Sequence, residues 1–204
     1  ALYNFIKTGI VKLVKTQSEK VVAEELPKII KEISDIFAFD KVINLINEVE
    51  LYLKLRKPRI CLYDHALHFI GGGQKYGCTI AECVQDDYET TLIANKKIDI
   101  KTLSKWYDLN LKKCKIKIAK LEINKYDEKI NPSIAESASA NPFAPVEDEV
   151  LKYDLMINVN MVPHINALSI KSIFICHFPD RPKKGFFYVD KYNKIITNSK
   201  YTTS

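Results

Sequence analysis

Apolar residues recur at helical spacing through residues 1–57, and this part of the 204-residue chain has no strand-like alternation. Residues 2–16 and 40–56 each place apolar side chains three or four positions apart, which predicts amphipathic helices. Pro58 cannot be accommodated within a continuing helix, so we expect the helical pattern to end before it. The pattern therefore predicts a helical N-terminal extension over residues 1–57.

Polar residues and proline predict where these helices start and stop. Ser18 and Pro27 predict a break and a fresh start within residues 19–37. Asp40 is a residue type that caps helix N-termini, and we expect it to cap the helix that runs to about Arg56. We therefore expect separate helical stretches, divided at these residues, before Pro58.

After Pro58 the pattern changes to short apolar runs that alternate with helical segments. Strands are predicted at residues 59–63, 88–94, 113–119, 155–159, 172–176 and 194–197. Helices are predicted at residues 74–83, after Asp99, and at 147–153, with a long loop over 123–146. Such alternation predicts a Rossmann-like α/β fold for residues 59–204, with a mainly parallel sheet and helices on both faces.

Composition is that of an ordinary soluble globular protein, with 47% hydrophobic and 27% charged residues and a net charge of +6. The densest basic region, residues 96–125, carries ten lysines interleaved with apolar residues. We interpret it as the solvated faces of a helix and a strand, and expect no nucleic-acid partner. A peripheral membrane contact through residues 1–57 stays open, although packing on protein is favoured because this segment lacks tryptophan.

Cysteine and histidine spacing argues against a disulfide framework and a metal site. The five cysteines are scattered and form no C-x-x-C pair, which predicts a reducing, cytoplasmic compartment. His65 and His68 lie near Cys78 and Cys83, but these two cysteines are five positions apart, about 140° around a helix. We therefore expect no bound metal.

The residues that follow the strands carry the candidate chemistry, because ligands of open parallel sheets bind beyond the carboxyl ends of the strands. The first strand is followed by Gly71, Gly72, Gly73 and Gln74, a turn in which glycines allow positive φ and backbone N–H groups can meet an anion. The dinucleotide fingerprint fits poorly, because its third glycine position is Tyr76. The second strand also runs out at an asparagine, Asn95, where that fingerprint requires an acid.

A histidine, His177, directly follows the strand predicted at 172–176, and Pro179 restricts the loop beyond it. Its position allows a functional role or a hydrogen-bonded structural one. Ser199, after the last strand, is interpreted as the N-cap of a helix that starts at Lys200.

Three segments in the same order together resemble the N-terminal domain of family-4 retaining glycosyltransferases of the GT-B fold. They are the Gly71–Gln74 loop, the strand with His177 in Lys171–Pro179, and Ile195–Thr202, and the resemblance spans residues 59–204. It implies transfer of a sugar from a nucleotide-sugar donor to a glycan or lipid-linked acceptor, in glycan or polysaccharide biosynthesis. It also implies retention of configuration, with neither a metal nor another cofactor.

The same resemblance assigns the site. Backbone N–H groups of Gly72 and Gly73 would meet the donor diphosphate, and His177 would contact the donor sugar as the catalytic residue. Gln74 departs from the family, which commonly has an acid there. The family's second Rossmann domain, which holds the nucleotide, would follow the last helix. The 204 residues are therefore expected to lack this donor domain and to be inactive alone.

Two other classes of function stay open. The chain could be a dinucleotide-binding oxidoreductase, against which the broken glycine pattern counts. It could also be a non-catalytic scaffold, in which residues 1–57 dock a partner or a membrane and the Rossmann-like unit binds no substrate. A second Rossmann domain in longer sequence would favour the transferase.

Overall fold

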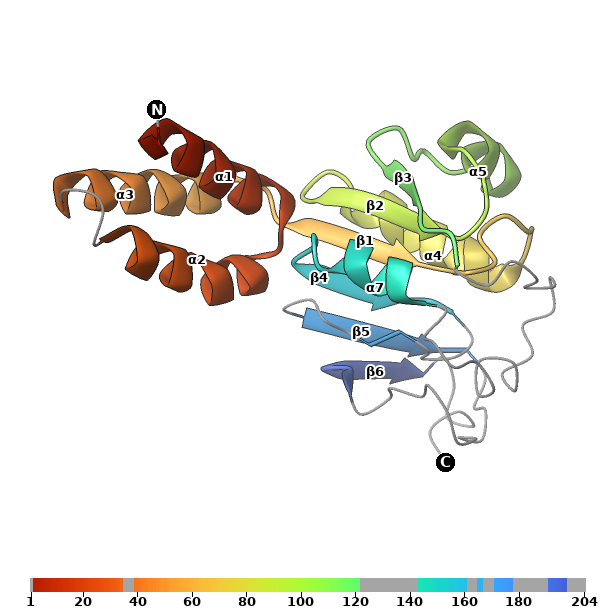
Figure 1. Cartoon of the computed structure of the whole chain (residues 1–204). Helices are drawn as coiled ribbons and strands as arrows, with labels where there is room; N and C mark the ends of the chain where they lie inside the picture. Colours follow the sequence, from red (N-terminus) through yellow and green to blue (C-terminus); the bar gives the residue numbers. More distant parts are fainter. Residues whose placement is uncertain are drawn as a thin grey trace.

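The computed structural model describes residues 2–34, 39–121, 143–160, 165–166, 171–177 and 191–197. Three helices come first: α1 (Leu2–Thr16), α2 (Glu19–Ser34) and α3 (Phe39–Leu55). They pack on one another around their own core, in which Ile10, Val22 and Leu45 are buried. Figure 1 shows these helices as a separate layer beside the sheet, with no strand in their described residues.

Helix α2 corrects one expectation, because it runs through Pro27 without the predicted break. Ser18 does start it, since the Ser18 side-chain oxygen accepts from the Val21 N–H at 3.3 Å. Proline inside a helix removes one hydrogen bond and costs about 3 kcal/mol. Val22 and Ile33, on either side of the proline, are buried in the three-helix core, and their burial offsets that cost.

The rest of the described chain forms one sheet of six strands, all parallel, in the order β3-β2-β1-β4-β5-β6. The strands are β1 (Arg59–Tyr63), β2 (Glu89–Ala94), β3 (Lys115–Ile118), β4 (Leu155–Asn158), β5 (Lys171–Cys176) and β6 (Lys194–Thr197). The predicted strands and the Rossmann-like α/β class are confirmed. The order itself depends on which strands pair, so it is visible only in the structure.

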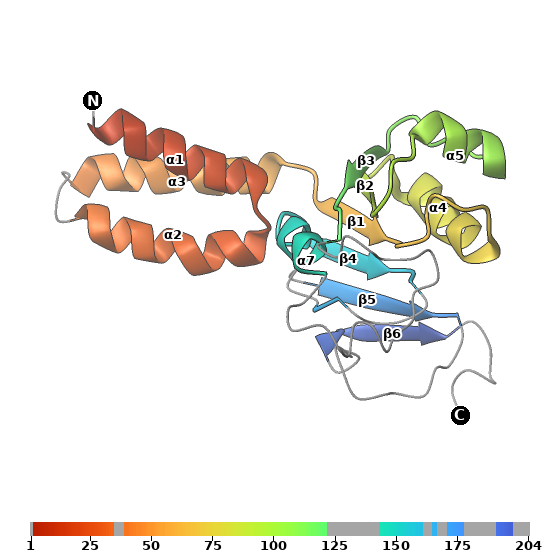
Figure 2. The same cartoon turned by 45° about the vertical axis from the view of Figure 1, so that its right-hand side comes forward.

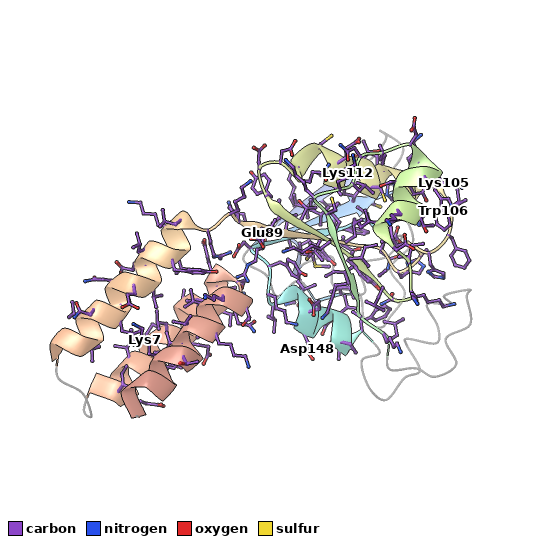
Figure 3. All side chains as sticks on the ribbon, turned by 90° about the horizontal axis from the view of Figure 1, so that it is seen from above. Lys7, Glu89, Lys105, Trp106, Lys112 and Asp148 are labelled. Carbon is purple, nitrogen blue, oxygen red and sulfur yellow. The ribbon has the colours of Figure 1, made fainter. Side chains whose placement is uncertain are left out.

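Helices cover both faces of this sheet. Helices α4 (Gly72–Val84) and α5 (Ile100–Tyr107) share one core with Leu62 and Leu92, while α7 (Ala144–Val150) shares another with Cys61 and Tyr63. Successive side chains of a strand point to opposite faces of the sheet, so alternate residues of β1 pack in the two cores. Figure 3 shows Asp148, on α7, across the sheet from Lys112 and the α4 side.

Three helices begin earlier than predicted. Helix α3 starts at Phe39, so Asp40 lies inside it and is not its N-cap. Helix α4 starts at Gly72 and not at Gln74, so two of the loop glycines form its first turn. Helix α7 starts at Ala144 and not at Glu147, because Pro145 suits the first turn of a helix, where no N–H is needed. Residues 123–142 of the predicted long loop lie outside the described residues.

The helical layer is joined to the amino edge of the sheet (Figure 2). Asp154, just before β4, accepts two hydrogen bonds from the Arg56 guanidinium at 2.6 and 2.7 Å. It also accepts from the N–H of Arg59 at 2.9 Å and from that of Glu19, at the start of α2, at 3.0 Å. The Asp154 carboxylate therefore joins the start of α2 and the end of α3 to the starts of β1 and β4.

Helix α1 is attached at the same edge by its carboxyl end. The Arg59 guanidinium donates to the backbone oxygen of Lys15 at 2.8 Å and to that of Gln17. A cation near the carboxyl terminus of a helix and an anion near the amino terminus both interact favourably with the helix dipole. Arg59 at the end of α1 and Asp154 at the start of α2 follow this rule.

Candidate functional site at the carboxyl edge of the sheet

The two central strands, β1 and β4, end together at the carboxyl edge of the sheet. Tyr63 pairs with Asn158 in the last register position of the two strands. The strand order reverses between them, since β2 and β3 lie on one side and β5 and β6 on the other. Ligands of open parallel sheets bind beside such a reversal. This edge lies opposite the helical layer (Figure 1).

The glycine segment forms the start of α4 at this edge. Gly71 precedes the helix in extended backbone, with φ of −164°, and its carbonyl accepts from Lys75 N–H at 3.0 Å. The N–H groups of Gly72, Gly73 and Gln74 lie in the first turn, where a helix offers no carbonyl to receive them. No described glycine has positive φ, so the conformational freedom that these glycines allow is not used here. The first-turn amides nevertheless have the geometry of a helix N-terminus, which can bind an anion.

Absence of a side chain is what these glycines contribute instead. A Cβ on Gly77 would lie 3.0 Å from Val159 Cγ2, so α4 and the end of β4 approach as closely as they do only with glycine there. A Cβ on Gly73 would lie 3.7 Å from the His177 ring. In the described part of the chain, no heavy atom lies within 4 Å of a Cβ built on Gly72, so a side chain can be added there without a clash with these residues.

Tyr107, at the end of α5, fixes the loop that leads into α4. Its hydroxyl accepts from Gly71 N–H at 3.2 Å and donates to the Phe69 carbonyl at 3.2 Å. These two bonds hold both sides of the exposed Ile70. Tyr107 was not among the residues selected from the sequence for this site.

His177 comes from the end of β5 and lies against the first turn of α4. Its ring lies 3.7 Å from where a Cβ on Gly73 would stand, and it meets the Tyr76 ring edge-on, with ring centroids 5.4 Å apart. The buried Nε2 atom has no hydrogen-bond partner in the described part of the chain. Partial burial lowers the pKa of His177 below its usual 6.5, so the imidazole is neutral at pH 7.

Gln74 is turned toward β1, because its side-chain amide donates to the Asp64 carboxylate at 2.9 Å. Asp64 is the residue that directly follows β1, and only 2% of it is exposed. The sequence analysis did not select Asp64, although its position after the first strand is the signal used to choose the other candidates. Gly77 was missed as well, because it stands one residue beyond the third glycine of the dinucleotide fingerprint.

The structure therefore brings together two of the sequence candidates, the Gly71–Gly73 turn and His177, and directs Gln74 to Asp64. Pro179, Ser199 and Lys200 lie outside the described residues. In the described part of the chain, no group of three or more His, Cys, Asp or Glu side chains could hold a metal ion. Among the described helices, none has the length and apolar character needed to cross a membrane.

The fold places the chain in the Rossmann-like class of parallel α/β proteins. Comparisons with known proteins add no family to that class: no protein-family model matches the chain, and no curated protein matches it significantly.

Proposed function

We propose that this Rossmann-like unit is the acceptor-side half of a retaining, metal-independent glycosyltransferase that takes a sugar from a nucleotide-sugar donor. The observation that carries the proposal is the contact between the first turn of α4 and His177. A neutral imidazole and a row of helix N-terminal amides lie side by side at the reversal of strand order. These are the two groups that the resemblance to family-4 enzymes assigns to the donor.

The chemistry of sugar transfer suits such a pair. When the bond from the anomeric carbon to the diphosphate breaks, negative charge builds up on the departing oxygen. Amides of Gly72 and Gly73, fixed by the helix, would stabilise that charge without having to reorganise. A neutral His177 would hydrogen-bond a sugar hydroxyl and orient the anomeric carbon toward the acceptor. The acceptor in this proposal is a glycan or a lipid-linked glycan.

A dinucleotide-binding oxidoreductase is the second candidate, and two observations favour it. The strand order is that of dinucleotide-binding domains, and Gly77 packs against Val159 as the third glycine of their fingerprint packs on the sheet. Asn95, at the end of β2, counts against it. Dinucleotide-binding proteins have an acidic residue at this position, which binds the ribose. The Asn95 side chain is bonded within the protein instead: its amide oxygen accepts from the Tyr63 hydroxyl, and its amide nitrogen donates to the Ala119 carbonyl.

Ligand titration of the ¹⁵N-labelled chain, followed by NMR, separates these candidates. Nucleoside diphosphates and a panel of nucleotide sugars should shift the Gly72 and Gly73 amide signals at millimolar concentration, while NAD(H) should not. Gly72→Val places a branched side chain in the first turn, beside the amides, and should abolish the shifts. Gly9→Val is the matched control, because Gly9 is also helical and also faces open space.

Three results would count against the transferase. Tighter binding of NAD(H) at the same amides would favour the oxidoreductase. Shifts that persist in Gly72→Val would place the ligand elsewhere. A chain that binds neither class of ligand would favour the scaffold.

A further inference from the structure

Asp64 is a buried carboxylate at the candidate site that the proposed chemistry does not use. It accepts two hydrogen bonds, one on each oxygen: Ala66 N–H donates to Oδ1 at 2.8 Å, and the Gln74 amide donates to Oδ2 at 2.9 Å. The first bond stays within the loop after β1. The second crosses to α4 and joins the end of the strand to the first turn of the helix.

The ionised form of Asp64 is costly where it stands. Burial raises the pKa of Asp64 to about 6, although the hydrogen bonds from Ala66 and Gln74 act in the opposite direction. Among the described residues, the titratable groups that face it are His65, whose Nδ1 is 3.7 Å from Oδ1, Cys78 of α4 and Tyr107 of α5. An asparagine has only one acceptor oxygen, so a carboxylate is needed to accept both bonds as they stand.

We propose that Asp64 is a positioning residue that holds the first turn of α4 through Gln74, and that protonation of Asp64 loosens this bond and makes the presentation of the Gly72 and Gly73 amides pH-dependent. The identity of the ligand that those amides bind rests on the proposed function. The coupling between Asp64 and the start of α4 is independent of the proposed function.

The geometry makes Gln74 the partner that responds. A proton on either carboxylate oxygen turns a charged acceptor into a neutral one, and hydrogen bonds to charged groups are about twice as strong as neutral ones. The Ala66 N–H is fixed by the tight loop after β1, where the Leu67 N–H also bonds the Asp64 carbonyl. Gln74, at the end of a flexible side chain, is free of that restraint and moves first.

The same arrangement explains why this chain has a glutamine at position 74, where the resembling family commonly has an acid. A glutamate there would face Asp64 across the 2.9 Å that now separates donor and acceptor. Two carboxylates at that separation cannot both be ionised, so one of them would keep a proton at neutral pH. The glutamine amide avoids this conflict and lets Asp64 ionise near neutral pH.

A pH titration followed by ¹⁵N NMR tests the coupling directly in the 204-residue chain. In a His177→Gln background, which removes the imidazole beside Gly73, the side-chain NH₂ signals of Gln74 and the backbone signals of Gly72 and Gly73 should shift together, with one inflection near pH 6. Asp64→Asn should remove the inflection from all three residues. His65→Gln should retain it, which distinguishes Asp64 from the neighbouring imidazole.

Two further variants keep the test decisive. Gln74→Leu leaves Asp64 in place and removes the donor, so the inflection at Gly72 and Gly73 should shrink several-fold even if Asp64→Asn fails to fold. Asp99→Asn alters an exposed capping carboxylate at the same edge, and it should leave the inflection unchanged. Glycine signals that do not titrate, or that still titrate in Asp64→Asn, would overturn the proposal. An intact inflection without any nucleotide-sugar binding would overturn the proposed function alone.

Discussion

His177 and Gly73 meet at the carboxyl edge of the sheet, where a Cβ on Gly73 would lie 3.7 Å from the imidazole ring. His177 directly follows β5, and Gly73 lies in the first turn of α4, which follows β1, so a single strand, β4, separates the two strands that lead into them. The contact is close enough that a single substrate could touch both groups. It gives each of them a role that can be tested without disturbing the rest of the fold.

Replacing His177 by alanine should affect sugar transfer far more than folding. We expect turnover to fall by about a hundredfold, the low end for the loss of a positioned polar group. The measurement needs a protein that contains both halves of the substrate site. The melting temperature should change little, because Nε2 has no hydrogen-bond partner in the described residues. Normal turnover, or a variant that unfolds, would assign His177 a structural role.

Gly77→Ala should destabilise the fold by about 1–2 kcal/mol, because the new methyl would press on the buried Val159 at 3.0 Å. The helical preference of alanine over glycine offsets about 1 kcal/mol of the strain. In a Val159→Ala background the same change should become stabilising, and Gly9→Ala, which faces open space, should stabilise in any background. Urea unfolding of Gly77→Ala, Val159→Ala, the double variant and Gly9→Ala measures the free energy of unfolding of each. Equal effects in both backgrounds would mean that Gly77 and Val159 do not constrain each other.

Stability should depend on pH through Asp64, and the sign follows from the direction of its pKa. The unfolded chain loses this proton near pH 3.8 and the folded chain near pH 6, so folding is disfavoured progressively as the pH rises between these values. Relative to Asp64→Asn, the wild type should lose about 2 kcal/mol between pH 4 and pH 7. Unfolding free energies at several pH values check this, and a constant difference would contradict it.

Arg56 should hold the helical layer to the sheet. Desolvation tends to raise the pKa of Asp154, but hydrogen bonds from Arg56, Arg59 N–H and Glu19 N–H together lower it below 3.8. Arg56→Met should cost roughly 3 kcal/mol, the lower end for leaving a buried charge without its partner. It should also speed proteolysis near residues 54–58. Because the pKa of Asp154 is lowered on folding, its carboxylate contributes to the free energy of unfolding above pH 3.8, and this contribution is lost as the pH falls further. Arg56→Met removes one cause of the lowered pKa, so its free energy of unfolding should fall less in acid than that of the wild type.

Lys7→Met is the control for that experiment. It removes the exposed ion pair with Glu48, at 2.8 Å, which joins α1 to α3 within the helical layer (Figure 3). Exposed pairs contribute less than about 1 kcal/mol, so both stability and the cleavage pattern should stay near those of the wild type. Equal effects of the two substitutions would mean that Arg56 has no special role in the attachment.

The sequence by itself determined the elements of this protein. Strand and helix periods, the Asp99 cap of α5 and the change of pattern at Pro58 are local properties, and the structure confirms them. Local signals failed where packing opposed them. Pro27 lies inside α2, whose Val22 and Ile33 are buried in the three-helix core, and two of the loop glycines form the first turn of α4, where a start at Gln74 was predicted.

Tertiary structure alone decided which residues form the candidate site. Strand order is set by long-range pairing, so only the fold could bring the turn after β1 beside the end of β5. Burial converts Asp64 from an ordinary loop acid into a carboxylate of raised pKa, and no sequence pattern reveals how much water surrounds a side chain. The need for glycine at position 77 likewise arises from Val159 on another element. Local sequence patterns determine which segments form helices and strands, whereas contacts between segments distant in the sequence determine the chemistry available at the site.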